Sequence, residues 1–140
     1  MLTTIEQFRD RLSAISNRAS RHLVAPTPEG IAELDRCRSE MARILSIYNL
    51  FVHREIFEPL LLAGSPIEAA AAKEMKVECI CLVEEFRRFS GEWRLANVAA
   101  AWAEFQPTAL NFRMRIQRHL DRVMAIADPA LSSRRLAEAA

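Results

Sequence analysis

The spacing of apolar residues divides the chain into four helical segments. Within each segment, apolar residues recur at alternating intervals of three and four, which keeps them on one face of an α-helix. No segment shows the period-two alternation of a half-buried strand. The expected helices cover about residues 3–22, 28–58, 66–89 and 95–127. The predicted core stripes are Ile5, Phe8, Leu12, Ile15 and Ala19; Leu34, Met41, Leu45, Tyr48 and Val52; Ala72, Met75, Cys79, Leu82, Phe86 and Phe89; and Ala109, Phe112, Ile116, His119, Val123 and Ile126.

Capping residues mark the beginnings of three of these helices. Thr3 followed by Glu6 has the spacing of a capping box. Thr27–Pro28 places an N-cap residue before a proline at the first helical position. Ser65–Glu68 combines both features.

Prolines and glycines indicate where the helices end. Pro59 and Gly64 are expected to close the second helix, and Ser90–Gly91 the third. Pro107 is expected to kink the fourth helix or restart it, and Asp128–Pro129 to stop it.

Four amphipathic helices joined by short turns predict an all-α protein. The expected architecture is an antiparallel up-down-up-down four-helix bundle. A length of 140 residues fits a single domain covering residues 1–140.

The composition argues against several classes of partner. A net charge of +1 gives no field suited to nucleic acid or an anionic membrane. No apolar stretch is long enough to span a bilayer, and Met1–Asp10 does not resemble a signal peptide. Three cysteines suggest no disulfide framework, so a reducing cytoplasm is the expected location.

The spacing between histidines and carboxylates gives no sign of a metal site. Helical bundles commonly build metal sites from a histidine and a carboxylate three or four residues apart. None of His22, His53 and His119 has a carboxylate at either spacing in its own segment. The sequence also has no glycine-rich phosphate loop and no nucleophile elbow, so we do not expect an enzyme.

One cluster of polar side chains is expected inside the core. His119, Cys79 and Tyr48 each occupy the middle of an apolar stripe. A buried tyrosine needs a hydrogen-bond partner, and either His119 or the Cys79 thiol is suitable. Two interpretations stay open: a remnant binding site, or a hydrogen-bonded layer that fixes the helix register. His53 is expected at a boundary, and Arg113, Arg115, Arg118 and Arg122 on a charged outer face.

Several short motifs resemble the hemerythrin-like (HHE cation-binding) family. Val77–Leu82 resembles the family's Glu-His opening of its third helix, with cysteine in place of histidine. The family's fourth-helix motif resembles three parts of this chain: Trp102–Phe105, Arg118–Leu120 and Pro129. Phe57–Leu61 resembles the phrase that closes the second helix, with one residue inserted before the proline. The resemblance covers most of the chain and implies the four-helix fold.

The resemblance also implies that the family's di-iron site is degenerate here. Members of the family hold two irons with histidines and carboxylates and use them for oxygen binding or sensing. Of the corresponding positions, only His119 keeps a ligand of the family's type. The others are Val123, Tyr48, Val52, Cys79 and either Ile5 or Phe8.

Two functions are therefore expected as alternatives. The first is a non-catalytic hemerythrin-like bundle without a di-iron site or other cofactor, acting as a regulatory or protein-interaction module. Its partner is an unidentified protein or small ligand, and Ala69–Ala72 would permit a homodimer. The second is an oxygen or redox sensor that binds a single metal ion or heme through His119 and Cys79.

Overall fold

The chain is helical throughout the part that the structure describes. The computed structural model describes the backbone of residues 4–139 and the side chains of residues 4–127. No strand occurs between residues 4 and 139, so the predicted all-α class is confirmed. The elements are α1 (Ile5–Ser20), α2 (Pro28–Val52), the π-helix η1 (His53–Phe57), α3 (Glu58–Ala63), α4 (Pro66–Glu92), α5 (Leu95–Ala100) and α6 (Trp102–Ala139).

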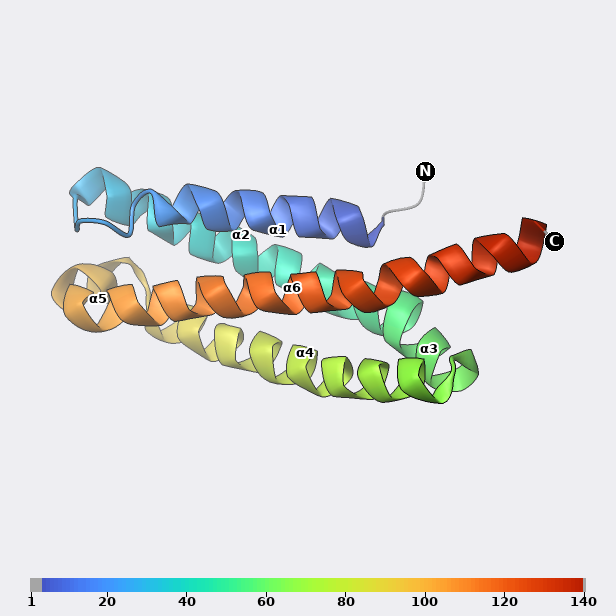
Figure 1. Ribbon diagram of the computed structural model, residues 1–140. Coiled ribbons are helices and arrows are strands. Elements are labelled where there is room, and N and C mark those ends of the chain that lie inside the picture. Colours follow the sequence, from blue (N-terminus) through green and yellow to red (C-terminus); the bar gives the residue numbers. More distant parts are fainter. Residues whose placement is uncertain (1–3, 140) are drawn as a thin grey trace.

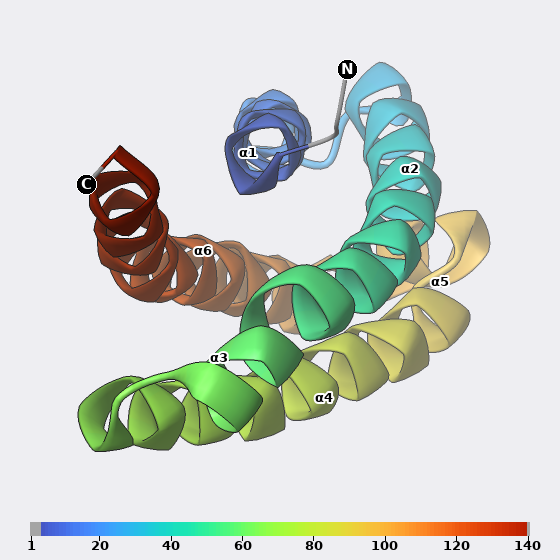
Figure 2. The same cartoon turned by 90° about the vertical axis from the view of Figure 1, so that its right-hand side faces the viewer.

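The four long helices contact one another in a ring. Helix α1 packs against α2 and α6, and α4 packs against the same two helices. Helices α2 and α6 therefore face each other across the interior, as the end view in Figure 2 shows. The short α3 folds back on α4 at one end, and α5 lies at the other end (Figure 1).

The predicted stripes form one continuous apolar core. Side chains from every long helix contribute to it, together with residues of η1, α3 and α5. Every predicted stripe residue is buried except Ala19, Ala109 and Ile126, which are partly buried and pack against the core. The spacing of apolar residues therefore identified the inward face of each long helix correctly.

The N-cap of the first helix, α1, is one residue later than predicted. Thr4 is the N-cap of α1: its hydroxyl accepts from the Gln7 amide, and its own amide donates to the Gln7 side chain. The predicted Thr3 lies outside the described residues. Thr4 and Gln7 have the same three-residue spacing as Thr3 and Glu6, so the sequence did not separate the two pairs. The predicted caps at Thr27 and Ser65 are confirmed.

Gly64 caps the end of the second helical run, as predicted, but Pro59 does not end it. The chain stays helical to Ala63 because the turn before the proline widens into η1, where the Glu58 amide donates to the carbonyl of His53. In a regular α-helix the proline ring would clash with the carbonyl four residues earlier. A π-turn is one of the recognised ways to absorb that conflict.

Helix α4, the third predicted helix, continues past Ser90–Gly91 and ends at Glu92. The backbone of the next residue, Trp93, leaves the helical region. The predicted end was wrong because a glycine lowers helix stability without stopping a helix whose other face is packed. Gly91 lies within α4 without a positive φ and is followed by one more helical residue.

The fourth predicted helix, residues 95–127, breaks at Ala101 instead of at Pro107. The Ala101 backbone leaves the helical region between α5 and α6, and α6 then runs without interruption through both Pro107 and Pro129. Each proline removes one backbone donor, and the hydrogen bonds on either side carry the helix across. No helix within the described residues is long and apolar enough to cross a membrane.

Two glycines provide a matched test of these helix ends. A Cβ added to Gly91 would meet no atom within 4 Å, whereas one added to Gly64 would lie 2.5 Å from the Leu60 carbonyl oxygen. We expect Gly91→Ala to raise the free energy of unfolding by about 0.5 kcal/mol. Gly64→Ala should lower it by about 1–3 kcal/mol. Urea denaturation measures both values, and equal effects of the two changes would contradict the described helix ends.

Candidate functional site

The centre of the candidate site is a hydrogen bond that crosses the core. The hydroxyl of Tyr48 on α2 lies 2.8 Å from Nε2 of His119 on α6. Only 1% of Tyr48 and 2% of His119 is exposed to solvent. Because α2 and α6 face each other across the interior, this bond spans the middle of the molecule.

The second ring nitrogen of His119 is also occupied. Its Nδ1 lies 2.9 Å from Oε1 of Glu78 on α4. A carboxylate can only accept, so Nδ1 carries the proton and donates to Glu78. Nε2 then accepts from the Tyr48 hydroxyl. Both nitrogens of the imidazole are therefore hydrogen-bonded by protein groups.

An arginine closes this chain of hydrogen bonds at the protein surface. Arg122, one helical turn after His119, donates from Nη1 to the second oxygen of Glu78. Its Nη2 lies 2.7 Å from Oε1 of Glu74, one turn earlier on α4. The Glu78 side chain is 30% exposed, and that of Arg122 is 41% exposed. The carboxylate next to the buried histidine is thus held in an ion pair at the edge of the core.

Burial controls the protonation of the two buried rings. It lowers the pKa of His119, against the opposing effect of the hydrogen bond to Glu78. Burial likewise raises the pKa of Tyr48 well above the ordinary value for tyrosine, and the nearby Cys79 and Glu78 add to that shift. Both rings are therefore neutral at neutral pH, as the hydrogen-bond directions require.

Cys79 lies beside this layer but does not bond to either ring. Its thiol donates to Oδ1 of Asn49 at 3.6 Å, and its side chain is fully buried. Burial, followed by the charge of Glu78, raises the pKa of Cys79 to about 12. The residue is a thiol at neutral pH, while thiolates are the form that binds metals and attacks electrophiles.

Sequence reasoning grouped Tyr48, Cys79 and His119, and the structure joins the first and the last of these directly. It missed Glu78, Arg122 and Asn49, which complete the layer. Spacing along the chain identifies carboxylates only on the same helix as a histidine, whereas Glu78 reaches His119 from a neighbouring helix. A usable signal was present, because Glu78 precedes the mid-stripe Cys79 and so lies at the edge of the buried face of α4.

The arginines of α6 do not form a uniform outer face. Arg122 and Arg115 pair across the helix interface with Glu78 and Glu85 of α4. Arg113 bonds instead to Asn17 of α1. The four arginines lie at the surface, as predicted, and two of them also connect α6 to α4.

His53 occupies the predicted boundary position, on η1. Its ring packs edge-on against Phe57, and burial lowers its pKa. Its Nε2 is buried and has no hydrogen-bond partner among the described residues. Within that part of the chain, no three His, Cys, Asp or Glu side chains are grouped so that they would hold a metal ion.

Comparisons with protein-family models, curated proteins and solved structures give no match to this chain. The chemistry of the site therefore has to be judged from its geometry. Both ring nitrogens of His119 and the hydroxyl of Tyr48 are hydrogen-bonded, and both rings are buried. This arrangement stabilises a particular alignment of α2, α4 and α6.

Because the pKa of His119 is lower in the folded protein than in the unfolded chain, protonation favours unfolding. Stability should be fully present above the unfolded pKa of about 6.5 and should fall as the pH drops toward the folded value. We expect the free energy of unfolding to fall by up to about 1.4 kcal/mol per pH unit in this window through His119. Denaturation at a series of pH values measures this slope. In His119→Gln the slope should be shallower, and an unchanged slope would contradict the buried neutral imidazole.

Proposed function

We propose that this protein is a hemerythrin-like four-helix bundle without a di-iron site that acts as a non-catalytic regulatory or protein-interaction module. The observation that supports it best is the closed hydrogen-bond chain from Tyr48 through His119 to Glu78. The single histidine at a family ligand position uses both nitrogens for protein contacts. A metal ion would have to displace the tyrosine or the glutamate.

The other positions that correspond to ligands of the family add to this argument. Val52 and Val123 are fully buried, and Tyr48 is nearly so. Apolar groups cannot compensate the cost of burying two metal ions. The ring of contacts among α1, α2, α4 and α6 agrees with a bundle whose frame resembles the family's and whose interior is filled by side chains.

The surface provides apolar side chains for contact with a protein partner. Leu62 and Ile67, on either side of the turn between α3 and α4, are 88% and 83% exposed. They are the two most exposed large hydrophobic residues with described side chains. Contiguous exposed apolar surface is typical of protein contact sites, and we propose that these two side chains belong to one.

The alternative function, a metal- or heme-binding sensor using His119 and Cys79, is less well supported. Coordination by Cys79 needs a thiolate, and burial raises the pKa of this thiol to about 12. Coordination by Nε2 of His119 needs the bond to Tyr48 to break.

The experiment has two parts that use the same purified protein. After expression with added iron, elemental analysis and absorption spectroscopy should find far less than one iron per chain and no visible absorption band. Stoichiometric iron or heme would contradict the proposal and favour the sensor.

The second part tests the interaction. Partner proteins that the immobilised wild-type chain retains should not be retained by the double variant Leu62→Ser/Ile67→Ser. Each such partner, once purified, should bind the wild-type chain directly. The control variant Val24→Ser/Leu95→Ser removes two other exposed apolar side chains, and it should still retain the partner proteins. Equal retention by all three proteins would argue against this surface, and no retained partner would argue against an interaction module.

A further inference from the structure

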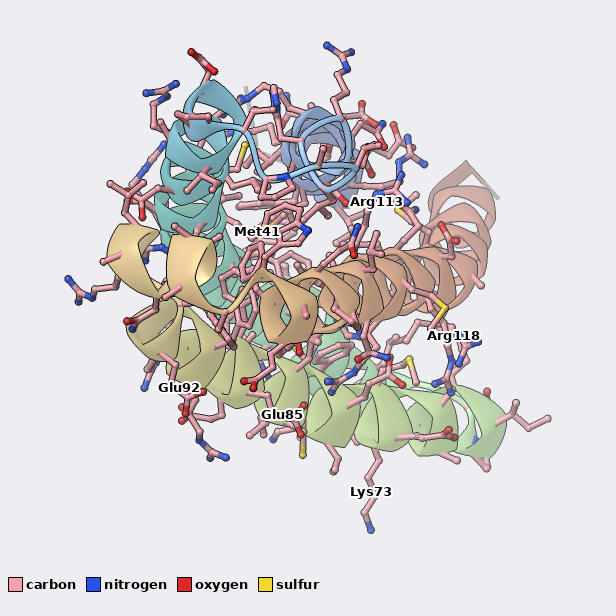
Figure 3. The ribbon with its side chains drawn as sticks, turned by 90° about the vertical axis from the view of Figure 1, so that its left-hand side faces the viewer. Met41, Lys73, Glu85, Glu92, Arg113 and Arg118 are labelled. Atoms are coloured by element: carbon pink, nitrogen blue, oxygen red, sulfur yellow. The ribbon has the colours of Figure 1, made fainter. Side chains whose placement is uncertain are left out.

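Helix α4 has one long face that no other part of the described chain covers. Its remaining sides pack against α2, η1, α3 and α6. In Figures 1 and 2, α4 forms an edge of the molecule with no element beyond it. Figure 3 shows Lys73 of this helix pointing away from the other helices. The outward face of α4 is therefore open to a partner.

Apolar side chains lie together at the centre of this outward face. Val77 is 57% exposed and Ile80 is 46% exposed, and the exposed Cys81 lies beside them. Positions three and four residues apart share one side of a helix, so these three side chains are neighbours. Of the alanines that would permit a homodimer, Ala70 is exposed on the same face two turns earlier, whereas Ala72 is fully buried. The centre of the face is thus apolar, as it is in protein interfaces.

Charges of opposite sign flank this apolar centre. Lys73 lies one turn before Val77, and Glu84 lies one turn after Ile80, both on the exposed side of the helix. Lys73 has no hydrogen-bond or ion-pair partner among the described residues. Within that part of the chain, Glu84 pairs only with Arg87 of its own helix, at 3.1 Å. An exposed pair of this kind is weak, so both charges are available to a partner.

This order of charges makes the face complementary to itself when two copies meet antiparallel. A two-fold axis midway between Val77 and Ile80 places each of these residues opposite the other in the second copy. Lys73 and Glu84 are equally far from that axis, so each meets the opposite charge across the contact. Arg87 comes opposite the small Ala70, and like charges do not face each other. A two-fold contact uses the same surface on both copies and closes as a dimer.

From this arrangement we propose that two copies of the chain form an antiparallel dimer through the outward face of α4. Val77 and Ile80 lie at its centre, and two Lys73–Glu84 ion pairs lie at its edges. The small net charge of +1 lets two copies approach without strong repulsion. Because the apolar centre is small, we expect a reversible dimer with Kd on the order of 10 μM. This contact goes beyond the proposed interaction function and does not rest on it, since it needs no other protein.

Sedimentation velocity of the purified wild-type chain tests the dimer at concentrations from about one tenth to about ten times that Kd. We expect the average sedimentation coefficient to rise across this range. Val77→Ser/Ile80→Ser should raise Kd about tenfold or more. The matched control Ile47→Ser/Leu50→Ser changes two side chains of the same spacing on α2, which are 45% and 73% exposed, and it should dimerise like the wild type.

An exchange of charges tests the antiparallel alignment. Lys73→Glu and Glu84→Lys should each raise Kd about tenfold, because each replaces two attractive pairs with two repulsive ones. The two changes combined in one chain restore opposite charges at both edges, so Kd should return to within about threefold of the wild-type value. All the substituted side chains are exposed, and circular dichroism checks that each variant is folded.

A wild-type chain that stays monomeric at every concentration would overturn the proposal. A dimer that Ile47→Ser/Leu50→Ser weakens as much as Val77→Ser/Ile80→Ser would overturn the assignment to α4. A combined charge variant that dimerises no better than the single variants would overturn the alignment that places Lys73 opposite Glu84.

Discussion

The relative alignment of α2, α4 and α6 depends on a buried chain of hydrogen bonds that needs all its members. Tyr48, His119 and Glu78 come from three different helices, and each would be costly to bury alone. Joined by hydrogen bonds of 2.8 and 2.9 Å, they satisfy one another. Sliding any of these helices along its neighbours would leave a buried polar atom without a partner, a penalty of about 1–3 kcal/mol. The layer therefore selects one register among the many that apolar stripes alone would allow.

The same layer leaves His119 without a free ring nitrogen for a metal ion. A histidine becomes a ligand through a free nitrogen lone pair, and here Tyr48 uses the lone pair of Nε2. Arg122 neutralises Glu78 from the opposite side, so the carboxylate is also engaged. Beyond this layer the interior changes character, because toward α5 the core consists of aromatic rings around a small cavity. The molecule thus has a polar, closed middle and an apolar end.

The sequence predicted local features well and contacts between helices less well. The inward faces followed from the spacing of apolar residues, because burial selects one side of each helix and repeats at its period. Helix ends were harder to predict. Pro59, Pro107 and Pro129 all lie within helices, since a packed helix tolerates the loss of one hydrogen bond, whereas the break at Ala101 has no proline or glycine to indicate it. Of the site, Tyr48 and His119 followed from their mid-stripe positions. Glu78 did not, because its contact with His119 depends on the relative rotation of two helices, which one sequence does not reveal.

The tautomer and protonation of His119 test the central claim most directly. Nitrogen-15 NMR of the imidazole, recorded across a pH titration, distinguishes a protonated Nδ1 from a protonated Nε2. The account predicts a neutral ring at neutral pH with the proton on Nδ1 and with Nε2 accepting a hydrogen bond, a signature that Tyr48→Phe should alter. A proton on Nε2, or a ring that titrates near the ordinary pKa of about 6.5 as an exposed histidine does, would contradict it.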